Sequence, residues 1–285
     1  MNTLVSEAYL AEIFSSFQGE GGTVRGSCFG KRQIFIRFYG CNIAEGAFDS
    51  NGCFWCDTPQ SRKFKQKDFQ YEKEPGSKEL WSIKNPVDIK TVIQIVESLR
   101  TPDLQSISLT GGEPLCQLNF ITFLLQGLEK YKIPGYLETN GTITPQDTDM
   151  KKLAKHIKFC CCDIKDESSR AASPDQWQNL ALRELEFIET MISYGIETFA
   201  KLVVTSATSY NTIEWISEKL SKISYPNGEP VGLAIQPVTL QEPKQTAEFS
   251  VSNRDLSKMF QLAAKYLPPS SLSLSLQAHK YLNLL

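Results

Sequence analysis

Short apolar runs alternate with amphipathic segments along most of this chain. Apolar residues recur with helical spacing in residues 87–99, 119–131, 147–156, 173–194, 212–223 and 253–266. Shorter runs with strand character occupy residues 106–110, 135–138, 157–163, 198–205, 231–236 and 271–277. Two further strands are expected earlier, at residues 10–15 and 33–39. Strands that alternate with helices of this length predict βα units and a parallel sheet.

Two stretches differ from this alternation of strands and helices. Residues 59–85 are polar and rich in lysine and show no clean period, so we expect an irregular, mostly exposed insertion there. Three consecutive cysteines at residues 160–162 lie inside an apolar run, which favours buried structural thiols. Neither stretch changes the overall pattern of about six βα units before the last strand.

The ends of the predicted strands carry the candidate chemistry. About six βα units are too many for one half of a dinucleotide-binding fold and too few for the eight of a complete TIM barrel. In both of these folds, ligands bind at the carboxyl ends of the strands. The loops after residues 39, 110, 138, 163, 205 and 236 should therefore face one site. Four of these ends carry polar motifs, namely a cysteine cluster, TGGEP at 110–114, ETNG at 138–141 and DIK at 163–165. Each motif alone is also typical of a turn or a solvated ion pair.

Composition excludes several classes of protein. The chain has 285 residues, of which 41% are hydrophobic and 22% charged, enough for one large or two small domains. A formal net charge of −2 gives no electrostatic reason to expect a nucleic-acid partner. No apolar run approaches the roughly 20 residues of a membrane span, and the N-terminal stretch lacks the basic region of a secretory signal. We expect a cytoplasmic protein with no nucleic-acid or membrane partner.

Three of the eight cysteines gather in one predicted loop. Cys41 follows the strand at residues 33–39, and Cys53 and Cys56 are spaced C-x-x-C. Structural zinc requires four ligands, and neither of the two histidines lies near this loop in the sequence. Three thiolates fit an iron–sulfur cluster with one open iron better than they fit structural zinc. A zinc site completed by a distant ligand such as Cys28 remains the alternative.

This combination of motifs resembles the radical S-adenosylmethionine (SAM) enzymes. In that superfamily three cysteines bind a [4Fe–4S] cluster, and the amino and carboxylate groups of SAM chelate the fourth iron. An electron from the cluster cleaves SAM to a 5′-deoxyadenosyl radical, which takes a hydrogen atom from the substrate. The resemblance implies an α/β fold, an incomplete TIM-like barrel of about six parallel βα units. It would form a single domain over residues 1–285, with a cluster loop at 41–56.

Motifs near both ends are similar to those of the 7-carboxy-7-deazaguanine synthase family. They are IFSSFQGEG at residues 13–21, FIR at 35–37, GCN at 40–42, WCDT at 55–58, QPV at 236–238 and HKYL at 279–282. The resemblance covers nearly the whole chain outside residues 59–85. It implies a lyase that converts 6-carboxy-5,6,7,8-tetrahydropterin to 7-carboxy-7-deazaguanine with loss of ammonia, supplying precursors of queuosine or archaeosine.

The resemblance also implies a set of site residues. Cys41, Cys53 and Cys56 would hold the cluster, and the hydroxyl of Thr58 would bind Mg²⁺. The implied SAM-binding positions are Gly112, Glu113, Glu138, Asp163 and Lys165. The implied substrate-binding positions are Phe17, Gln18, Gly19, Glu20, Arg37, Thr110, Gln236, His279 and Leu285, the last through the terminal carboxylate. No side chain is expected to be catalytic alone, because the radical derives from SAM.

The cysteine spacing departs from the C-x3-C-x2-C pattern that is usual in the superfamily. Here the spacing is C-x11-C-x2-C, and we expect the eleven turn-forming residues to loop out over the cluster at little extra entropic cost. Asn283 and Leu285 also replace the family's more usual glycine and proline. The resemblance further implies a homodimer and an electron donor such as flavodoxin or ferredoxin. Two alternatives remain, a radical SAM enzyme with another substrate, such as a glycyl-radical activase, and a zinc-stabilised binding module.

Overall fold

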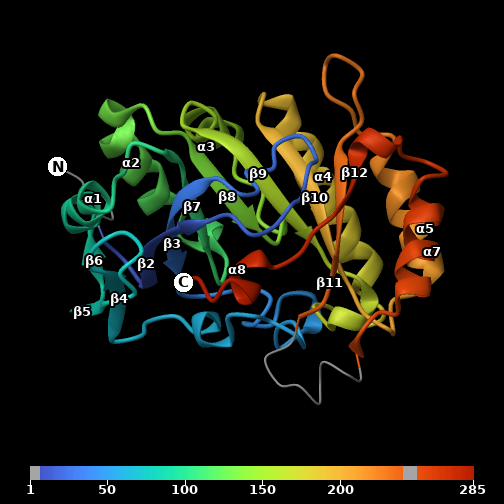
Figure 1. Ribbon diagram of the computed structural model, residues 1–285, viewed down its shortest axis with the longest axis horizontal. Helices are drawn as coiled ribbons and strands as arrows, with labels where there is room; N and C mark the ends of the chain where they lie inside the picture. Colours follow the sequence, from blue (N-terminus) through green and yellow to red (C-terminus); the bar gives the residue numbers. More distant parts are fainter. Residues whose placement is uncertain (1–6, 240–248) are drawn as a thin grey trace.

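A ten-stranded sheet organises the computed structural model, which describes residues 7–239 and 249–285 (Figure 1). The order of its strands is β12-β11-β10-β9-β8-β7-β3-β2-β4-β5. The first seven strands in this order, β12 to β3, are parallel to one another. These strands are β3 (Arg32–Phe38), β7 (Leu104–Gly111), β8 (Gly135–Thr139), β9 (Ile157–Ile164), β10 (Glu197–Val204), β11 (Gly232–Pro237) and β12 (Leu272–Leu274). The remaining strands of the sheet are β2 (Leu10–Phe17), β4 (Asp68–Glu72) and β5 (Leu80–Lys84). A separate two-stranded sheet pairs β1 (Glu7–Ala8) with β6 (Val87–Asp88).

Helices connect the parallel strands, as the sequence pattern predicts. They are α1 (Ile89–Ser98), α2 (Leu118–Leu128), α3 (Asp147–Leu153), α4 (Trp177–Ser193), α5 (Tyr210–Leu220), α7 (Asn253–Ala263) and α8 (Ala278–Tyr281). Helices α1 and α2 lie toward one end of the sheet and α5 and α7 toward the other, whereas the short α8 lies near the middle of the view (Figure 1). The α/β fold with alternating strands and helices is confirmed. Within the described residues, no helix combines the length and apolarity needed to span a membrane.

Two predicted boundaries shift for a local reason. The strand expected at residues 271–277 ends at Leu274, because Ser275 and Gln277 turn inward and hydrogen-bond to Gln236 and Glu20. The helix expected from residue 173 begins at Trp177, since the preceding residues form a turn instead. In the first case side-chain hydrogen bonds, and in the second case a turn, set the end of the element in place of the local apolar pattern.

Residues 59–85 are mostly exposed, as predicted, but the prediction that they are irregular is wrong. This stretch contains the antiparallel hairpin β4–β5, and β4 pairs in parallel with β2 to extend the main sheet. The side chain of Phe69 is buried in the core, but Glu72 is equally buried and accepts hydrogen bonds from the backbone N–H groups of Ser15 and Lys78. A buried carboxylate inside an edge hairpin breaks the apolar period, which explains why the sequence pattern missed these strands.

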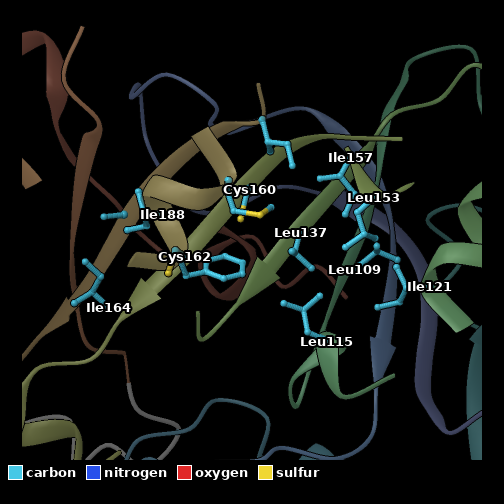
Figure 2. Close-up of a cluster of buried hydrophobic side chains, with 14 of the residues drawn as sticks. Leu109, Leu115, Ile121, Leu137, Leu153, Ile157, Cys160, Cys162, Ile164 and Ile188 are labelled. Atoms are coloured by element: carbon cyan, nitrogen blue, oxygen red, sulfur yellow. The ribbon is translucent and has the colours of Figure 1, made fainter. Parts of the chain in front are cut away.

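The main core lies between the parallel sheet and the helices that cover it. Figure 2 shows buried side chains of β7, β8 and β9, such as Leu109 and Leu137, directed toward side chains of α2, α3 and α4. Alternation along β9 separates the three consecutive cysteines. Cys160 and Cys162 belong to this core, whereas Cys161 belongs to a second cluster inside the curve of the sheet. All three thiols are buried and free, as expected.

Candidate active site

A deep cleft opens at the carboxyl ends of the parallel strands. It encloses about 1530 Å³ of space, including its open mouth. The loops after β3, β7, β8, β9 and β11 all contribute to its lining, as predicted. The described loop after Thr205 does not, and Lys201 and Val203 line the cleft from within β10 instead.

All three cysteines of the cluster loop line this cleft. The loop is anchored at both ends by backbone hydrogen bonds, from the N–H of Cys41 to the carbonyl of Arg62 (3.1 Å) and from the N–H of Phe54 to the carbonyl of Ser169 (2.7 Å). Between these anchors, Ile43 is buried against Ala171 and Leu180. The eleven residues that separate the first two cysteines therefore fold back onto the segment before α4, rather than only looping out over the cluster.

Burial keeps the thiols of this loop protonated until a metal binds. Burial raises the pKa of the Cys53 thiol to about 12 and also raises that of Cys41, so metal binding must displace protons here. Among the described residues, no three His, Cys, Asp or Glu side chains already stand close enough to hold one ion. In a four-iron cluster each thiolate binds a different iron, so the thiolates stand further apart.

The alternative of a zinc site completed by Cys28 is not supported. Cys28 lies in a buried cluster with Val24, Tyr136 and Phe199, and it does not line the cleft. Burial raises the pKa of its thiol to about 11, as expected for a structural thiol that stays protonated. The loop therefore offers three thiols to the cleft, and Cys28 does not add a fourth.

The TGGEP segment brings its backbone against the strand that precedes the cysteine loop. Gly111 has φ +125°, and a Cβ there would lie 2.4 Å from backbone atoms of Phe38. The N–H of Gly112 donates to the carbonyl of Phe38 (2.9 Å), and the N–H of Glu113 donates to the carbonyl of Gly40 (2.7 Å). Gly111 and Gly112 line the cleft, so their backbone is open to a bound ligand beside the cysteines.

Glu113 differs from its predicted role. Its carboxylate is fully buried and does not line the cleft, because it accepts hydrogen bonds from the N–H of Leu115, the hydroxyl of Thr139 and the N–H of Asn140. Burial raises the pKa of Glu113 to about 6. The side chain ties the TGGEP turn to the loop after β8, which makes it a positioning residue here rather than a direct ligand contact.

Alanine in place of Gly112 is expected to weaken SAM binding by more than about tenfold, or roughly 1.4 kcal/mol. The new Cβ would stand 2.1 Å from the carbonyl oxygen of Gly40 and 2.7 Å from that of Ser61, so backbone would have to move. Equilibrium binding of SAM to the reconstituted protein measures this effect. Gly127→Ala is the matched control, because its Cβ would meet only the flexible end of Ile93. Equal SAM affinity in both variants would contradict the close backbone approach.

A chain of buried charges crosses the floor of the cleft. Lys201 donates to Glu20 (2.6 Å) and lies 3.6 Å from Asp163, its register partner on the adjacent strand β9. Lys165 donates to the same oxygen of Asp163 (2.5 Å). Burial alone would raise the pKa of Glu20, but the charge and hydrogen bond of Lys201 outweigh it and hold that pKa below its ordinary value. The other oxygen of Asp163, Oδ1, is buried and has no hydrogen-bond partner within residues 7–239 and 249–285, and Asp163 lines the cleft.

A second polar group surrounds Gln18. Its amide Nε2 donates to Glu138 (2.8 Å), which also accepts from the hydroxyls of Ser108 and Thr110 (3.1 Å each). Burial, followed by the nearby charge of Glu20, raises the pKa of Glu138. The structure thus places Glu138 with the residues predicted to bind substrate, rather than apart from them with the SAM set.

The C-terminal segment closes against the turn at residues 18–20. A Cβ on Gly19 would lie 3.0 Å from both the backbone N and the Nδ1 of His279, and the N–H of Ala278 donates to the carbonyl of Gly19 (3.2 Å). Burial lowers the pKa of His279, which favours the neutral imidazole. His279 and Leu285 both line the cleft, as the sequence prediction requires.

The remaining predicted positions also reach the cleft. Arg37 lines it while donating to Glu12 (3.0 Å), and Thr58 lines it with its hydroxyl 3.4 Å from the carbonyl of Gly111. In full, the predicted residues that line the cleft are Phe17, Gln18, Gly19, Glu20, Arg37, Cys41, Cys53, Cys56, Thr58, Thr110, Gly112, Glu138, Asp163, Lys165, Gln236, His279 and Leu285. Only Glu113 of the predicted set stays outside.

Sequence reasoning missed several residues of the site. Lys201 and Gln277 both donate to Glu20, and Gln277 also donates to Asp57 (3.1 Å). Cys161 and Arg62 line the cleft as well. A lone lysine within the apolar strand sequence FAKLVV was the available signal for Lys201, because a buried charge needs a partner. Asp57 directly precedes Thr58 in the sequence, but the sequence does not predict its contact with Gln277.

Two sequence relatives match most of the chain, and one family model matches more than half of it. The family described as "4Fe-4S single cluster domain" matches residues 20–185. A 7-carboxy-7-deazaguanine synthase of Thermococcus kodakarensis is 36% identical over 280 residues, covering 97% of this chain and 98% of the relative. One of Methanothermobacter thermautotrophicus is 33% identical over 277 residues, covering 93% and 94%. Among solved structures, a domain of a pyruvate-formate lyase-activating enzyme of Bacteroides vulgatus aligns with TM-score 0.45 at 13% identity, over 60% of this chain and 98% of that one.

The sequence relatives decide between the remaining alternatives. Both relatives are named 7-carboxy-7-deazaguanine synthase, and both align with this chain over nearly their full lengths. The segment that matches the iron–sulfur family contains the three cysteines and the TGGEP turn. The chain belongs to the 7-carboxy-7-deazaguanine synthase family of radical SAM enzymes, which use a [4Fe–4S] cluster and SAM.

Proposed function

We propose that this cleft converts 6-carboxy-5,6,7,8-tetrahydropterin to 7-carboxy-7-deazaguanine with loss of ammonia. One observation supports the proposal above all. The cysteine loop and the polar residues around Glu20 line the same cleft, so a cofactor and a small polar substrate would be held side by side. The two relatives that align over nearly their full lengths are named as synthases of 7-carboxy-7-deazaguanine, the proposed product.

The side of the cleft near the cysteines is the cofactor side. Cys41, Cys53 and Cys56 would hold the cluster, whose role with SAM is to supply the radical. The exposed backbone at Gly112 suits the polar methionine end of SAM. Asp163 Oδ1 is a buried acceptor with no protein donor, so a hydroxyl or amine of SAM would satisfy it. Lys165 would hold the Asp163 side chain in place for that contact through its ion pair with Oδ2.

The opposite side of the cleft suits the pterin. A pterin presents an amino-pyrimidinone edge with adjacent hydrogen-bond donors and acceptors. The carboxylate of Glu20 and the amides of Gln18 and Gln236 offer complementary acceptors and donors. Arg37 offers a guanidinium for the substrate carboxylate or ring. His279 and Leu285 would close the cleft above the substrate, because α8 packs directly on the turn at Gly19.

A magnesium ion would bind at the base of the cysteine loop. Thr58 places a hydroxyl in the cleft, and the neighbouring carboxylate of Asp57 is held by Gln277. Mg²⁺ prefers oxygen ligands and retains water, so Thr58 with the substrate carboxylate forms a reasonable partial shell. We further propose that the enzyme works in the cytoplasm as a homodimer and receives electrons from a small donor such as flavodoxin or ferredoxin.

Anaerobic turnover tests the proposed function. The reconstituted protein is incubated with SAM, dithionite, Mg²⁺ and 6-carboxy-5,6,7,8-tetrahydropterin, and products are measured by liquid chromatography with mass spectrometry. We expect 7-carboxy-7-deazaguanine and one equivalent of ammonia. Omission of Mg²⁺ should reduce the rate. Cleavage of SAM without 7-carboxy-7-deazaguanine would contradict the substrate assignment and leave the membership of the superfamily intact.

A further inference from the structure

Arg62 carries a positive charge beside the cysteine loop without a carboxylate partner. It lies at the end of a short 3₁₀ helix, Pro59–Arg62, directly after the third cysteine, and its side chain lines the cleft. No described Asp or Glu lies within ion-pair distance of its guanidinium. Its Nε is buried and has no hydrogen-bond partner among the described residues. A buried N–H of a cationic group that lacks an acceptor is costly unless something else satisfies it.

The guanidinium sits against the backbone that carries two of the cluster ligands. Its Nη2 donates to the carbonyl oxygen of Cys53. A Cβ on Gly52 would lie 3.3 Å from both Cζ and Nε of Arg62, so the group packs directly on the Gly52–Cys53 peptide. The backbone carbonyl of Arg62 accepts from the N–H of Cys41 (3.1 Å). One residue therefore contacts the loop at its first and its second cysteine.

The other buried cations of the cleft are already paired. Lys165 forms an ion pair with Asp163, and Lys201 forms one with Glu20. Their charges are therefore partly neutralised by the protein itself. Arg62 is different, since none of the ion pairs formed among the described residues includes it, although it lines the same cleft as Cys41, Cys53 and Cys56.

We propose that Arg62 is the counter-charge of the iron–sulfur cluster and raises its reduction potential. A [4Fe–4S] cluster with three thiolates is net negative, and one added electron makes it more so. A fixed positive charge close by stabilises the reduced form more than the oxidised form. Arginine cannot lose its proton in a protein, so this charge is constant over the working pH range. The proposal rests on the cluster alone and is independent of the substrate.

Two substitutions separate the charge from the hydrogen bond. Arg62→Gln keeps an N–H donor for the Cys53 carbonyl but removes the charge, whereas Arg62→Lys keeps the charge on a different donor. Each full-length variant is reconstituted anaerobically, assayed for iron and sulfide, and titrated with dithionite while the reduced cluster is followed by electron paramagnetic resonance. Arg183→Gln is the control for net charge, because Arg183 is half-exposed on α4 beside Glu186.

We expect Arg62→Gln to shift the midpoint potential to a more negative value, while Arg62→Lys and Arg183→Gln stay near the unmodified protein. Loss of cluster in the Gln variant with retention in the Lys variant would also support the proposal, since charge is then what the cluster needs. Equal midpoint potentials in all proteins would overturn it. Loss of cluster in both Arg62 variants would also overturn it, and would assign Arg62 a purely structural anchor role.

Discussion

Alanine in place of Cys53 should leave the protein folded but unable to retain a complete cluster, and turnover should fall below detection. The Cys53 thiol lies at the wall of the cleft, and its backbone carbonyl is held by Arg62. Removing one of three thiolates leaves two irons of a four-iron cluster without a protein ligand, which the remaining contacts cannot replace. Iron and sulfide per chain, the absorbance of the reconstituted protein and anaerobic product formation measure the loss.

Cys116→Ala is the matched control for this prediction. Cys116 is a free, partly buried thiol close enough to affect Cys41 electrostatically, but it does not line the cleft. Its removal should leave iron content and turnover near those of the unmodified protein. Full iron content in the Cys53 variant, or equal loss in both variants, would contradict the assignment of Cys41, Cys53 and Cys56 as the cluster ligands.

Methionine in place of Lys201 should destabilise the protein and weaken substrate binding. The substitution leaves Glu20 buried without its ion-pair partner, and breaking a buried pair in this way costs about 3–5 kcal/mol. Glu20 then responds by binding a proton, so it no longer offers a charged acceptor to the substrate. Loss of a charge-assisted hydrogen bond of ~1.5–3 kcal/mol corresponds to roughly 10- to 100-fold weaker binding. Chemical denaturation and equilibrium binding of the pterin measure the two effects.

The loss of stability in Lys201→Met should depend on pH in a defined direction. In the unmodified protein Lys201 holds the pKa of Glu20 below its ordinary value, so their pairing stabilises the fold at neutral pH and is lost as pH falls through the lowered pKa. In Lys201→Met the main opposition to burial is lost, so burial raises the pKa of Glu20. The folded variant then binds a proton that the unfolded chain lacks, so the stability gap between the two proteins should narrow as pH falls toward 4.5, the ordinary pKa of glutamate.

Two further variants make the Lys201 prediction specific. Glu20→Gln added to Lys201→Met removes the orphaned carboxylate and should restore part of the lost stability. Lys151→Met, which breaks an exposed pair with Asp147 on α3, should change little, because solvent screens that pair. A Lys201 variant as stable as the Lys151 control at neutral pH would contradict a buried pair at the floor of the cleft.

The sequence could predict most of the site because the strands are parallel and buried. Their apolar runs mark where each strand ends, and the polar residues that follow must then meet at one edge of the sheet. Cys41 after β3, Gly112 after β7 and Lys165 after β9 were found in this way, and all three line the cleft.

Other parts of the site depend on contacts between distant residues, which local sequence patterns do not predict. The pair of Lys201 with Glu20 joins residues far apart in the chain, and its geometry is fixed by the register that sets Lys201 beside Asp163. Glu113 has the right sequence context for ligand binding, but the folded chain satisfies its carboxylate with donors from the loop after β8. Such assignments follow only from three-dimensional packing.

The central claim is that this cleft holds a [4Fe–4S] cluster whose open iron faces SAM. Electron paramagnetic resonance of the reduced, anaerobically reconstituted full-length protein, recorded without and with SAM, tests it most directly. We expect about four irons and four sulfides per chain, as a four-iron cluster requires, and a cluster signal that changes saturably as SAM is added. A protein that binds stoichiometric zinc without iron, or a full cluster whose signal is unchanged by SAM, would contradict the account.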